Sequence, residues 1–254
     1  MTAKKWVIGN WKLQGSLASN RGLIECIRAR LPVLDERVGM AVSPVFPYLP
    51  QVADLIKGSG IDLGAQNLSE QVKGAYTGEV AGTMLKDVGV KFVIVGHSER
   101  RAYQGEDDEL IARKVRSALD AGLVPVLCVG ETRDEREAGE TWAILLRQLN
   151  AVFDLIDSSK DDIVLAYEPR WAIGTGVSAT PEMIADVHGF LRTYLVARHV
   201  EFGARTPILY GGSMNGANAA TIAIIPDVDG GLIGSAALKA DEFVSIYDAL
   251  RAAA

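Results

Sequence analysis

Short, almost continuously apolar stretches alternate along this chain with longer segments whose apolar residues recur at helical spacing. The stretches are rich in β-branched residues, and most of them close on Gly, Pro, Asn or Ser. They span residues 6–12, 38–44, 61–67, 92–98, 124–130, 163–169, 207–213 and 228–236. Continuous apolar runs of this length are typical of parallel strands that are covered on both faces.

The longer segments between these stretches predict amphipathic helices. One apolar stripe combines Trp142, Leu145, Leu146, Leu149, Phe153 and Ile156, and a second combines Phe243, Ile246, Tyr247 and Leu250. Thr180 followed by Pro181 predicts the start of another helix, with the threonine as N-cap and the proline at the first helical position.

Eight strand–helix units in 254 residues predict an α/β fold, a closed (β/α)8 TIM barrel of parallel strands. No low-complexity linker or charge block divides the chain, so we expect one domain over residues 1–254. The main alternative is an open, doubly wound sheet, but eight units would make it unusually wide. The first strand also ends in GNWK, without the glycine pattern that binds dinucleotides.

Composition and charge narrow the possible functions. Hydrophobic residues make up 48% of the chain and charged residues 23%, which is enough for a sizeable core. The net charge of −6 argues against nucleic acid as a partner, because binding phosphate backbones needs a basic face. Cys26 and Cys128 show no paired spacing, which favours a reduced, cytoplasmic protein. We expect no signal peptide and no membrane span, since no apolar run approaches about 20 residues.

In a barrel of this kind, chemistry collects at the carboxyl ends of the strands. The residues found there are Asn10, Lys12, Gln66, Asn67, His97, Ser98, Cys128, Glu168, Ser213, Gly234 and Ser235. Taken singly, Lys12 fits a solvated lysine, His97 a core histidine, Glu168 a cap or ion-pair partner, and Cys128 a small hydrophobe beside the site. A cation, an imidazole and a carboxylate at the ends of three different strands favour a catalytic site over packing alone.

His97 precedes Ser-Glu-Arg-Arg, which predicts a short helix with Ser98 as N-cap. A helix N-terminus disfavours a nearby positive charge by about 0.3–1 kcal/mol, which lowers an imidazole pKa by less than one unit. Lys12 would act in the same direction. We therefore expect a mostly neutral imidazole that is suited to donating a hydrogen bond to a carbonyl oxygen.

Three glycine-containing segments, at 172–176, 210–213 and 231–236, fall on one side of the predicted rim. Small residues let backbone N–H groups approach an oxyanion closely, and barrels often bind phosphate after strands seven and eight. Each segment alone could equally be a tight turn. Together they favour a phosphate-bearing ligand.

Several motifs then resemble the triosephosphate isomerase family over residues 6 to about 239. They are GNWK at 9–12, VGHSERR at 95–101, YEPRWAIGTG at 167–176, YGGS at 210–213 and DGGLIG at 229–234. The combination of VGHSERR with WAIGTG is highly specific. The resemblance implies an isomerase that interconverts dihydroxyacetone phosphate and D-glyceraldehyde 3-phosphate in glycolysis and gluconeogenesis, without metal or other cofactor.

The resemblance also implies roles for individual residues. Asn10 and Lys12 would bind the substrate's oxygens, and His97 would polarise its carbonyl group. Glu168 would move a proton between C1 and C2 through a cis-enediolate. A carboxylate base with a neutral histidine and a closing loop is a known pairing for this reaction.

The family's phosphate ligands correspond to Gly174, Ser213, Gly234 and Ser235, through backbone N–H groups. Its lid corresponds to residues 169–179, whose closure would exclude water and so raise the basicity of the glutamate. Tyr210 and Ser213 would latch the closed lid near Ala179 and Gly176.

Supporting roles follow from the same resemblance. Glu131 would bind the lid's Trp171, and Glu99 would assist the histidine, although a structural ion pair explains Glu99 as well. The segment 74–79 would insert Thr77 beside the site of a partner subunit, which implies a homodimer. An ordinary surface turn is the alternative there.

The chain departs from the usual family pattern at Arg170, Val177, Ser235 and the pair Leu13 and Gln14. Ser235 keeps its N–H, so its contact with phosphate depends on backbone angles that a non-glycine residue can adopt. We expect Arg170 to point outward and to affect the kinetics of the lid.

Two other functions compete with the isomerase. A different phosphosugar isomerase or epimerase would need a metal or a larger pocket, and the sequence shows no His/Asp/Glu cluster for a metal. A phosphate-binding protein without activity would be expected to lose Lys12, His97 or Glu168, and all three are present.

Overall fold

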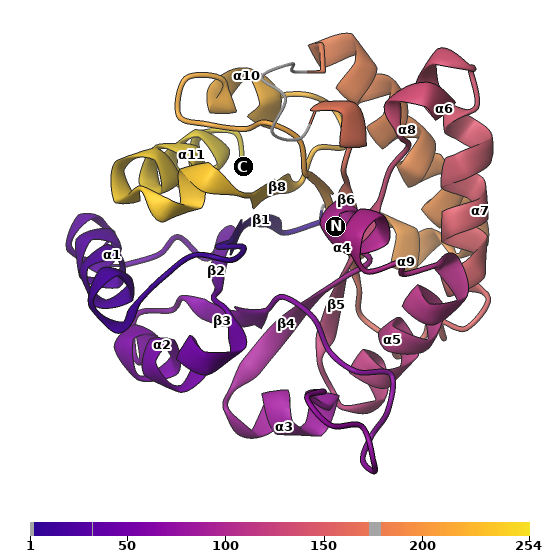
Figure 1. Cartoon of the computed structure of the whole chain (residues 1–254). Coiled ribbons are helices and arrows are strands. Elements are labelled where there is room, and N and C mark those ends of the chain that lie inside the picture. Colours follow the sequence, from indigo (N-terminus) through magenta and orange to yellow (C-terminus); the bar gives the residue numbers. More distant parts are fainter. Residues whose placement is uncertain (1–2, 32, 173–178) are drawn as a thin grey trace.

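The computed structural model, which describes residues 3–31, 33–172 and 179–254, shows a closed barrel of parallel strands in sequential order (Figure 1). The strands are β1 (Lys5–Asn10), β2 (Val38–Ser43), β3 (Asp62–Ala65), β4 (Val90–Val95), β5 (Val124–Val129), β6 (Val164–Tyr167), β7 (Ile208–Tyr210) and β8 (Gly230–Ile233). β8 pairs with β1 and closes the ring. All eight predicted strands and the (β/α)8 fold are therefore confirmed.

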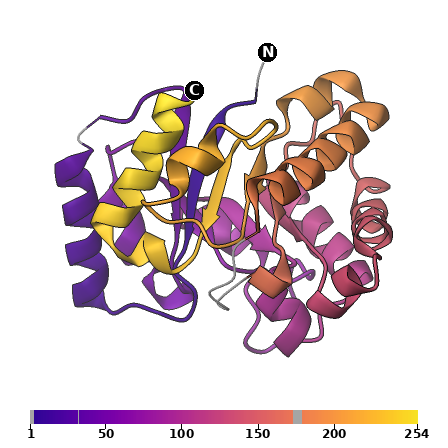
Figure 2. The ribbon, with the colours of Figure 1, turned by 90° about the horizontal axis from the view of Figure 1, so that it is seen from above.

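Helices surround the barrel on its outer side (Figure 1). They are α1 (Leu17–Arg30), α2 (Leu49–Ile56), α3 (Gly82–Asp87), α4 (Ser98–Tyr103), α5 (Asp108–Asp120), α6 (Arg133–Glu137), α7 (Thr141–Phe153), α8 (Pro181–Arg198), α9 (Val200–Arg205), α10 (Ala219–Ala223) and α11 (Ala240–Ala252). Three short 3-10 turns, η1 (Phe46–Tyr48), η2 (Arg170–Ala172) and η3 (Ser235–Leu238), follow strands β2, β6 and β8. Seen from above, the C-terminal end of α11 lies on the side of the barrel where β1 begins (Figure 2).

Alternation along the strands separates two layers of the core. Alternate residues pack together as one buried cluster, namely Trp6, Ile8, Ala41, Phe92, Ile94, Val126, Cys128, Val164, Ala166, Leu209 and Leu232. The intervening strand residues pack against the helices in a second, larger cluster. Because side chains alternate along a strand, extending the first series by two residues predicts where functional side chains face the barrel axis. It reaches Asn10, Glu168, Gly211 and Gly234, all of which line one cavity.

Of the two predicted apolar stripes, the one on α7 needs correction. In the first predicted stripe, Leu145, Leu149 and Phe153 are buried, but Trp142 is 43% exposed and Leu146 38% exposed. The buried face of α7 combines these three buried residues with Ile144, Gln148 and Val152, so the predicted stripe lies too far towards the solvent-exposed side of the helix. The stripe on α11 is confirmed, since all four of its residues are fully buried.

The caps give one confirmed prediction and one error. Thr180 caps α8 by accepting a hydrogen bond from the Met183 N–H, and Pro181 occupies the first helical position. Ser98, by contrast, is not the cap of α4, because it is already the first helical residue. The cap is His97, whose ring takes the place that a serine hydroxyl would fill.

Candidate active site

Lys12 follows β1 in a backbone conformation that is rare for a side chain other than glycine, with φ of 53°. Two amides hold it there. The Lys12 N–H donates to Asn10 Oδ1 at 3.0 Å, and Gln66 Nε2 donates to the Lys12 carbonyl at 2.9 Å. Strained backbone of this kind persists where its surroundings fix it, and it is common at functional sites. The Lys12 ammonium lies 2.6 Å from Glu99 Oε1.

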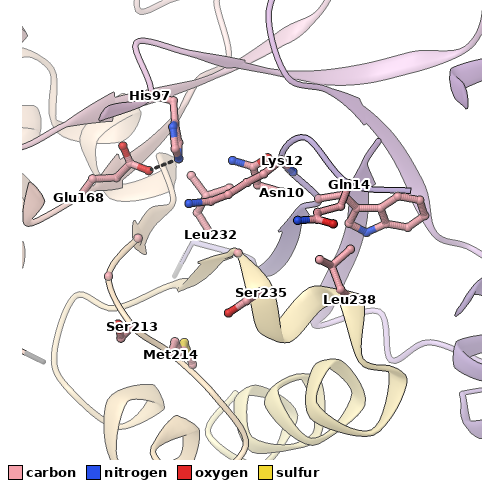
Figure 3. Close-up of a pocket in the computed structure, with 14 residues that line it drawn as sticks. Asn10, Lys12, Gln14, His97, Glu168, Ser213, Met214, Leu232, Ser235 and Leu238 are labelled. Atoms are coloured by element: carbon pink, nitrogen blue, oxygen red, sulfur yellow. Dashed lines mark hydrogen bonds and ion pairs between the residues drawn. The ribbon is translucent and has the colours of Figure 1, made fainter. Parts of the chain in front are cut away.

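His97 connects α4 to the end of β6. Its Nδ1 accepts a hydrogen bond from the Glu99 N–H at 3.3 Å, and its Nε2 lies 3.0 Å from Glu168 Oε1 (Figure 3). A ring nitrogen that accepts a hydrogen bond carries no proton, so the other nitrogen, Nε2, holds the hydrogen. The imidazole therefore donates from Nε2 to Glu168 Oε1, and both residues line the same cavity.

Glu168 is 2% exposed at the end of β6. Its second carboxylate oxygen, Oε2, accepts a hydrogen bond from the Ser98 N–H at 2.8 Å, so both oxygens have partners at the start of α4. Two glycines make room for it. A Cβ on Gly211 would lie 2.7 Å from Glu168 Cγ, and a Cβ on Gly130 would lie 1.8 Å from the Glu168 carbonyl oxygen.

The His97–Glu168 pair sets the electrostatics of the site. Burial lowers the pKa of His97, but the adjacent Glu168 carboxylate, with help from Glu99, outweighs burial and raises that pKa above 6.5. The expected lowering of the His97 pKa is therefore wrong for this arrangement, because it left Glu168 out. Burial raises the pKa of Glu168, but His97, the Ser98 N–H and Lys12 together hold it below 4.5.

Cys128 is buried beside this pair, and burial and the nearby Glu168 raise the pKa of its thiol well above the usual value. An uncharged thiol is a poor nucleophile, which agrees with the interpretation of Cys128 as a small apolar neighbour of the site.

A cavity of about 240 Å³ lies between these groups and the ends of β7 and β8 (Figure 3). Asn10, Lys12, His97 and Glu168 line one end of the cavity. Small residues line the other, namely Gly211, Gly212, Ser213, Gly234 and Ser235. Ser235 is the first residue of η3, and positive φ among the described non-glycine residues occurs at Lys12 and Asp227. A serine at position 235 therefore causes no backbone strain.

Comparison with known proteins identifies the family. The family model described as triosephosphate isomerase matches residues 5–250. The chain is 51% identical to the triosephosphate isomerase of Paracidovorax citrulli, over 98% of this chain and 99% of that one. It is 50% identical to that of Cupriavidus taiwanensis, over 97% of this chain and 99% of the relative, and 47% identical to that of Nitrosomonas eutropha, over 97% and 98%. The chain belongs to the triosephosphate isomerase family.

The structure brings together several residues that the family resemblance assigned to the lid. Trp171 Nε1 donates to Glu131 Oε1 at 2.9 Å, as predicted. Ser213 Oγ donates to the Ala172 carbonyl at 3.1 Å. Burial raises the pKa of Tyr210 to about 12, with a smaller opposing effect from the backbone of Ala179 nearby. Gly174, Gly176 and Val177 lie outside the described residues.

Sequence reasoning missed two side chains at this hinge. Tyr167 donates its hydroxyl to Glu131 at 3.1 Å, and Arg136 contacts the same carboxylate from α6. Tyr167 stands directly before Glu168 in the quoted motif, so its position was available as a signal. No pattern in the sequence pointed to Arg136.

Thr77 is exposed in the loop between β3 and α3 and is not among the residues that line the cavity of its own chain. Over the described ranges, no group of three or more His, Cys, Asp or Glu side chains could hold a metal ion. None of the helices in that part of the chain is long and apolar enough to cross a membrane.

Proposed function

We propose that this chain interconverts dihydroxyacetone phosphate and D-glyceraldehyde 3-phosphate by proton transfer through a cis-enediolate. The observation that carries the proposal is the convergence of Lys12, His97 and Glu168 on one cavity, opposite a row of small residues suited to phosphate. A triose phosphate would lie with its phosphate group towards Ser213, Gly234 and Ser235. Its carbonyl and hydroxyl oxygens would then face Asn10, Lys12 and His97.

Glu168 is the base in this proposal. To reach a substrate carbon, its carboxylate must leave the Ser98 N–H and His97 Nε2, which occupy both of its oxygens in the unliganded site. It takes a proton from C1 of dihydroxyacetone phosphate and returns a proton to C2. Losing these polar partners while staying buried makes the carboxylate more basic, because burial alone raises its pKa.

His97 and Lys12 stabilise the negative charge that develops on the oxygens. When Glu168 turns away, His97 Nε2–H is released to donate to the carbonyl oxygen. The Glu168 carboxylate, which raises the pKa of His97, then leaves. Burial, the largest effect, and Lys12 lower that pKa, against Glu99, which still raises it. The substrate complex therefore favours the neutral imidazole that the sequence predicted.

Residues 169–179 act as the lid in this proposal, with Gly174 as a phosphate ligand and Tyr210 and Ser213 as latches. Support comes from the anchored first turn of the segment, where Trp171 binds Glu131 and the Ala172 carbonyl accepts from Ser213. The Arg170 N–H contributes to this anchor by donating to the Glu131 carbonyl at 3.1 Å.

The active unit proposed here is a homodimer in which Thr77 approaches the partner's site. A second cavity of about 450 Å³ opens beside the first and shares Asn10, Lys12 and His97 with it. Its rim carries Leu13, which is 92% exposed, and Tyr103, which is 80% exposed. Apolar side chains exposed at the mouth of a cavity favour coverage by another chain. Light scattering tests this, and a fully active monomer would remove the role given to Thr77.

The remaining elements of the proposal are a single domain over residues 1–254, glycolysis and gluconeogenesis as the context, and the cytoplasm as the location. No cofactor or metal is proposed. Cys26 and Cys128, which are both free, suit a reducing compartment.

Isotope exchange separates this mechanism from a hydride shift assisted by metal. The protein, treated with a chelator, would be incubated with D-glyceraldehyde 3-phosphate in deuterium oxide, and the product examined by proton NMR. Proton transfer through an enediolate predicts deuterium at C1 of dihydroxyacetone phosphate. Full retention of the substrate hydrogen would favour a hydride shift, and no turnover at all would favour a binding protein.

A further inference from the structure

Glu131 is a fully buried carboxylate whose oxygen Oε1 accepts from three side chains. Tyr167 donates its hydroxyl at 3.1 Å, Trp171 its Nε1–H at 2.9 Å, and Arg136 its Nη1–H at 3.1 Å. Two of these donors are neutral. Burying a carboxylate with neutral donors alone is costly, so the Arg136 cation carries much of the compensation.

Arg136 also contacts the indole that binds the same carboxylate. Its guanidinium carbon lies 4.8 Å from the centroid of the Trp171 ring. A planar guanidinium can stack on an aromatic face while its N–H groups bind a carboxylate, which a lysine ammonium cannot match. Arg136 thus fixes Trp171 twice, through the ring directly and through Glu131.

Trp171 belongs to η2, the turn that begins two residues after Glu168. The main chain at Glu168 and at Arg170 is hydrogen-bonded to the end of β5 and to Glu131, which follows it. The Glu168 N–H donates to the Val129 carbonyl at 2.8 Å, and the Arg170 N–H donates to the Glu131 carbonyl at 3.1 Å. A shift of Glu131 is therefore transmitted, through its hydrogen bond from the Arg170 N–H, to the main chain that follows Glu168.

We propose that Arg136 is a positioning residue for the isomerase reaction, which holds Glu168 in register by clamping Glu131 and Trp171. Arg136 lines a separate groove with Arg133, Glu137 and Trp171, and it is not among the residues that line the substrate cavity. This inference rests on the proposed function, in which Glu168 is the base.

The chain offers a matched control in Arg133, three residues earlier on α6. Arg133 also borders the groove beside Trp171, but it pairs with Glu137 at 2.8 Å and both side chains are mostly exposed. Arg133→Ala removes the same kind of side chain from the same helix without touching Glu131.

The test compares Arg136→Ala with Arg133→Ala by steady-state kinetics. Misplacement of a catalytic group by a fraction of an ångström predicts a loss in kcat of about tenfold for Arg136→Ala, with KM changed less than threefold. Added guanidinium chloride at tens of millimolar should restore part of that kcat, whereas sodium chloride at the same concentration should not. Arg133→Ala should keep kcat within about twofold.

A double mutant separates positioning from a general loss of structure. Glu131→Gln removes the charge that Arg136 neutralises and leaves only the contact of Arg136 with the Trp171 ring, so adding Arg136→Ala to it should cost clearly less than the tenfold expected for Arg136→Ala alone. Wild-type kcat in Arg136→Ala, or equal losses with and without Glu131→Gln, would overturn the positioning role. An inactive wild-type protein would instead contradict the proposed function itself.

Discussion

His188 offers a quantitative test of the core. This histidine on α8 is fully buried, its Nδ1 lies 3.0 Å from the Asp227 carbonyl, and its Nε2 has no hydrogen-bond partner within the described residues. Burial outweighs Asp227 and lowers the pKa of His188 from 6.5 to about 4. The ring is thus neutral in the folded protein, and Nδ1 donates to the carbonyl.

The sign of the pH effect follows from this shift. An unfolded chain protonates the ring below pH 6.5, whereas the folded protein resists protonation until about pH 4. The contribution of His188 to the free energy of unfolding is therefore fully present well above pH 6.5, and it is lost as the pH falls towards 4. The 2.5-unit difference corresponds to a limit of about 3.4 kcal/mol, of which about 1.8 kcal/mol is lost between pH 7 and pH 5.

The perturbation is His188→Asn, since an asparagine amide can still donate to the Asp227 carbonyl but does not titrate. Urea unfolding at pH 7 and pH 5, at one protein concentration, gives the free energy of unfolding of each variant. The wild type should lose about 1.8 kcal/mol more than His188→Asn over this interval. An equal loss in His188→Asn and wild type would refute the reasoning.

The remaining predictions concern the site. Lys12→Met should lower kcat/KM by about 10³-fold or more without unfolding the protein, because charge on the substrate oxygens loses its cation; a loss under tenfold in the coupled assay would contradict this role. Gly211→Ala should lower kcat by about 10²-fold, because its Cβ would lie 2.7 Å from Glu168 Cγ. Gly189→Ala, where a Cβ meets nothing within 4 Å, should leave kcat unchanged and raise the free energy of unfolding by about 0.5–1 kcal/mol. Ser235→Gly should keep kcat/KM within about twofold, since Ser235 has no positive φ, and a larger change would show that the serine side chain matters.

Much of the barrel could be predicted because its strands are buried on both faces. Such strands leave uninterrupted apolar runs, and alternation along them places Asn10 and Glu168 at the end of the inward-facing series. The predicted stripe on α7 was partly wrong because it included residues that lie on the surface. Trp142 is large and apolar, but it lies on the surface with its ring 4.9 Å from that of Phe190. Apolar character alone could not separate it from the buried face.

Contacts between distant strands could not be predicted in the same way. The hydrogen bond between His97 and Glu168 depends on a side-chain direction that the ends of β4 and β6 do not specify. Omitting it reversed the expected shift of the His97 pKa. The positive φ of Lys12 was equally hidden, because it results from hydrogen bonds to Asn10 and Gln66 rather than from a glycine in the sequence.

The central claim is that Glu168 moves the substrate proton in a metal-independent isomerase. The most direct test is a coupled assay of D-glyceraldehyde 3-phosphate conversion after chelation, with the wild type and Glu168→Gln side by side and inorganic phosphate binding measured on both. The account predicts rapid turnover by the wild type, and a loss of kcat of about 10³-fold or more in the variant with phosphate affinity retained. An inactive but folded wild-type protein, or a variant within tenfold of the wild type, would contradict it.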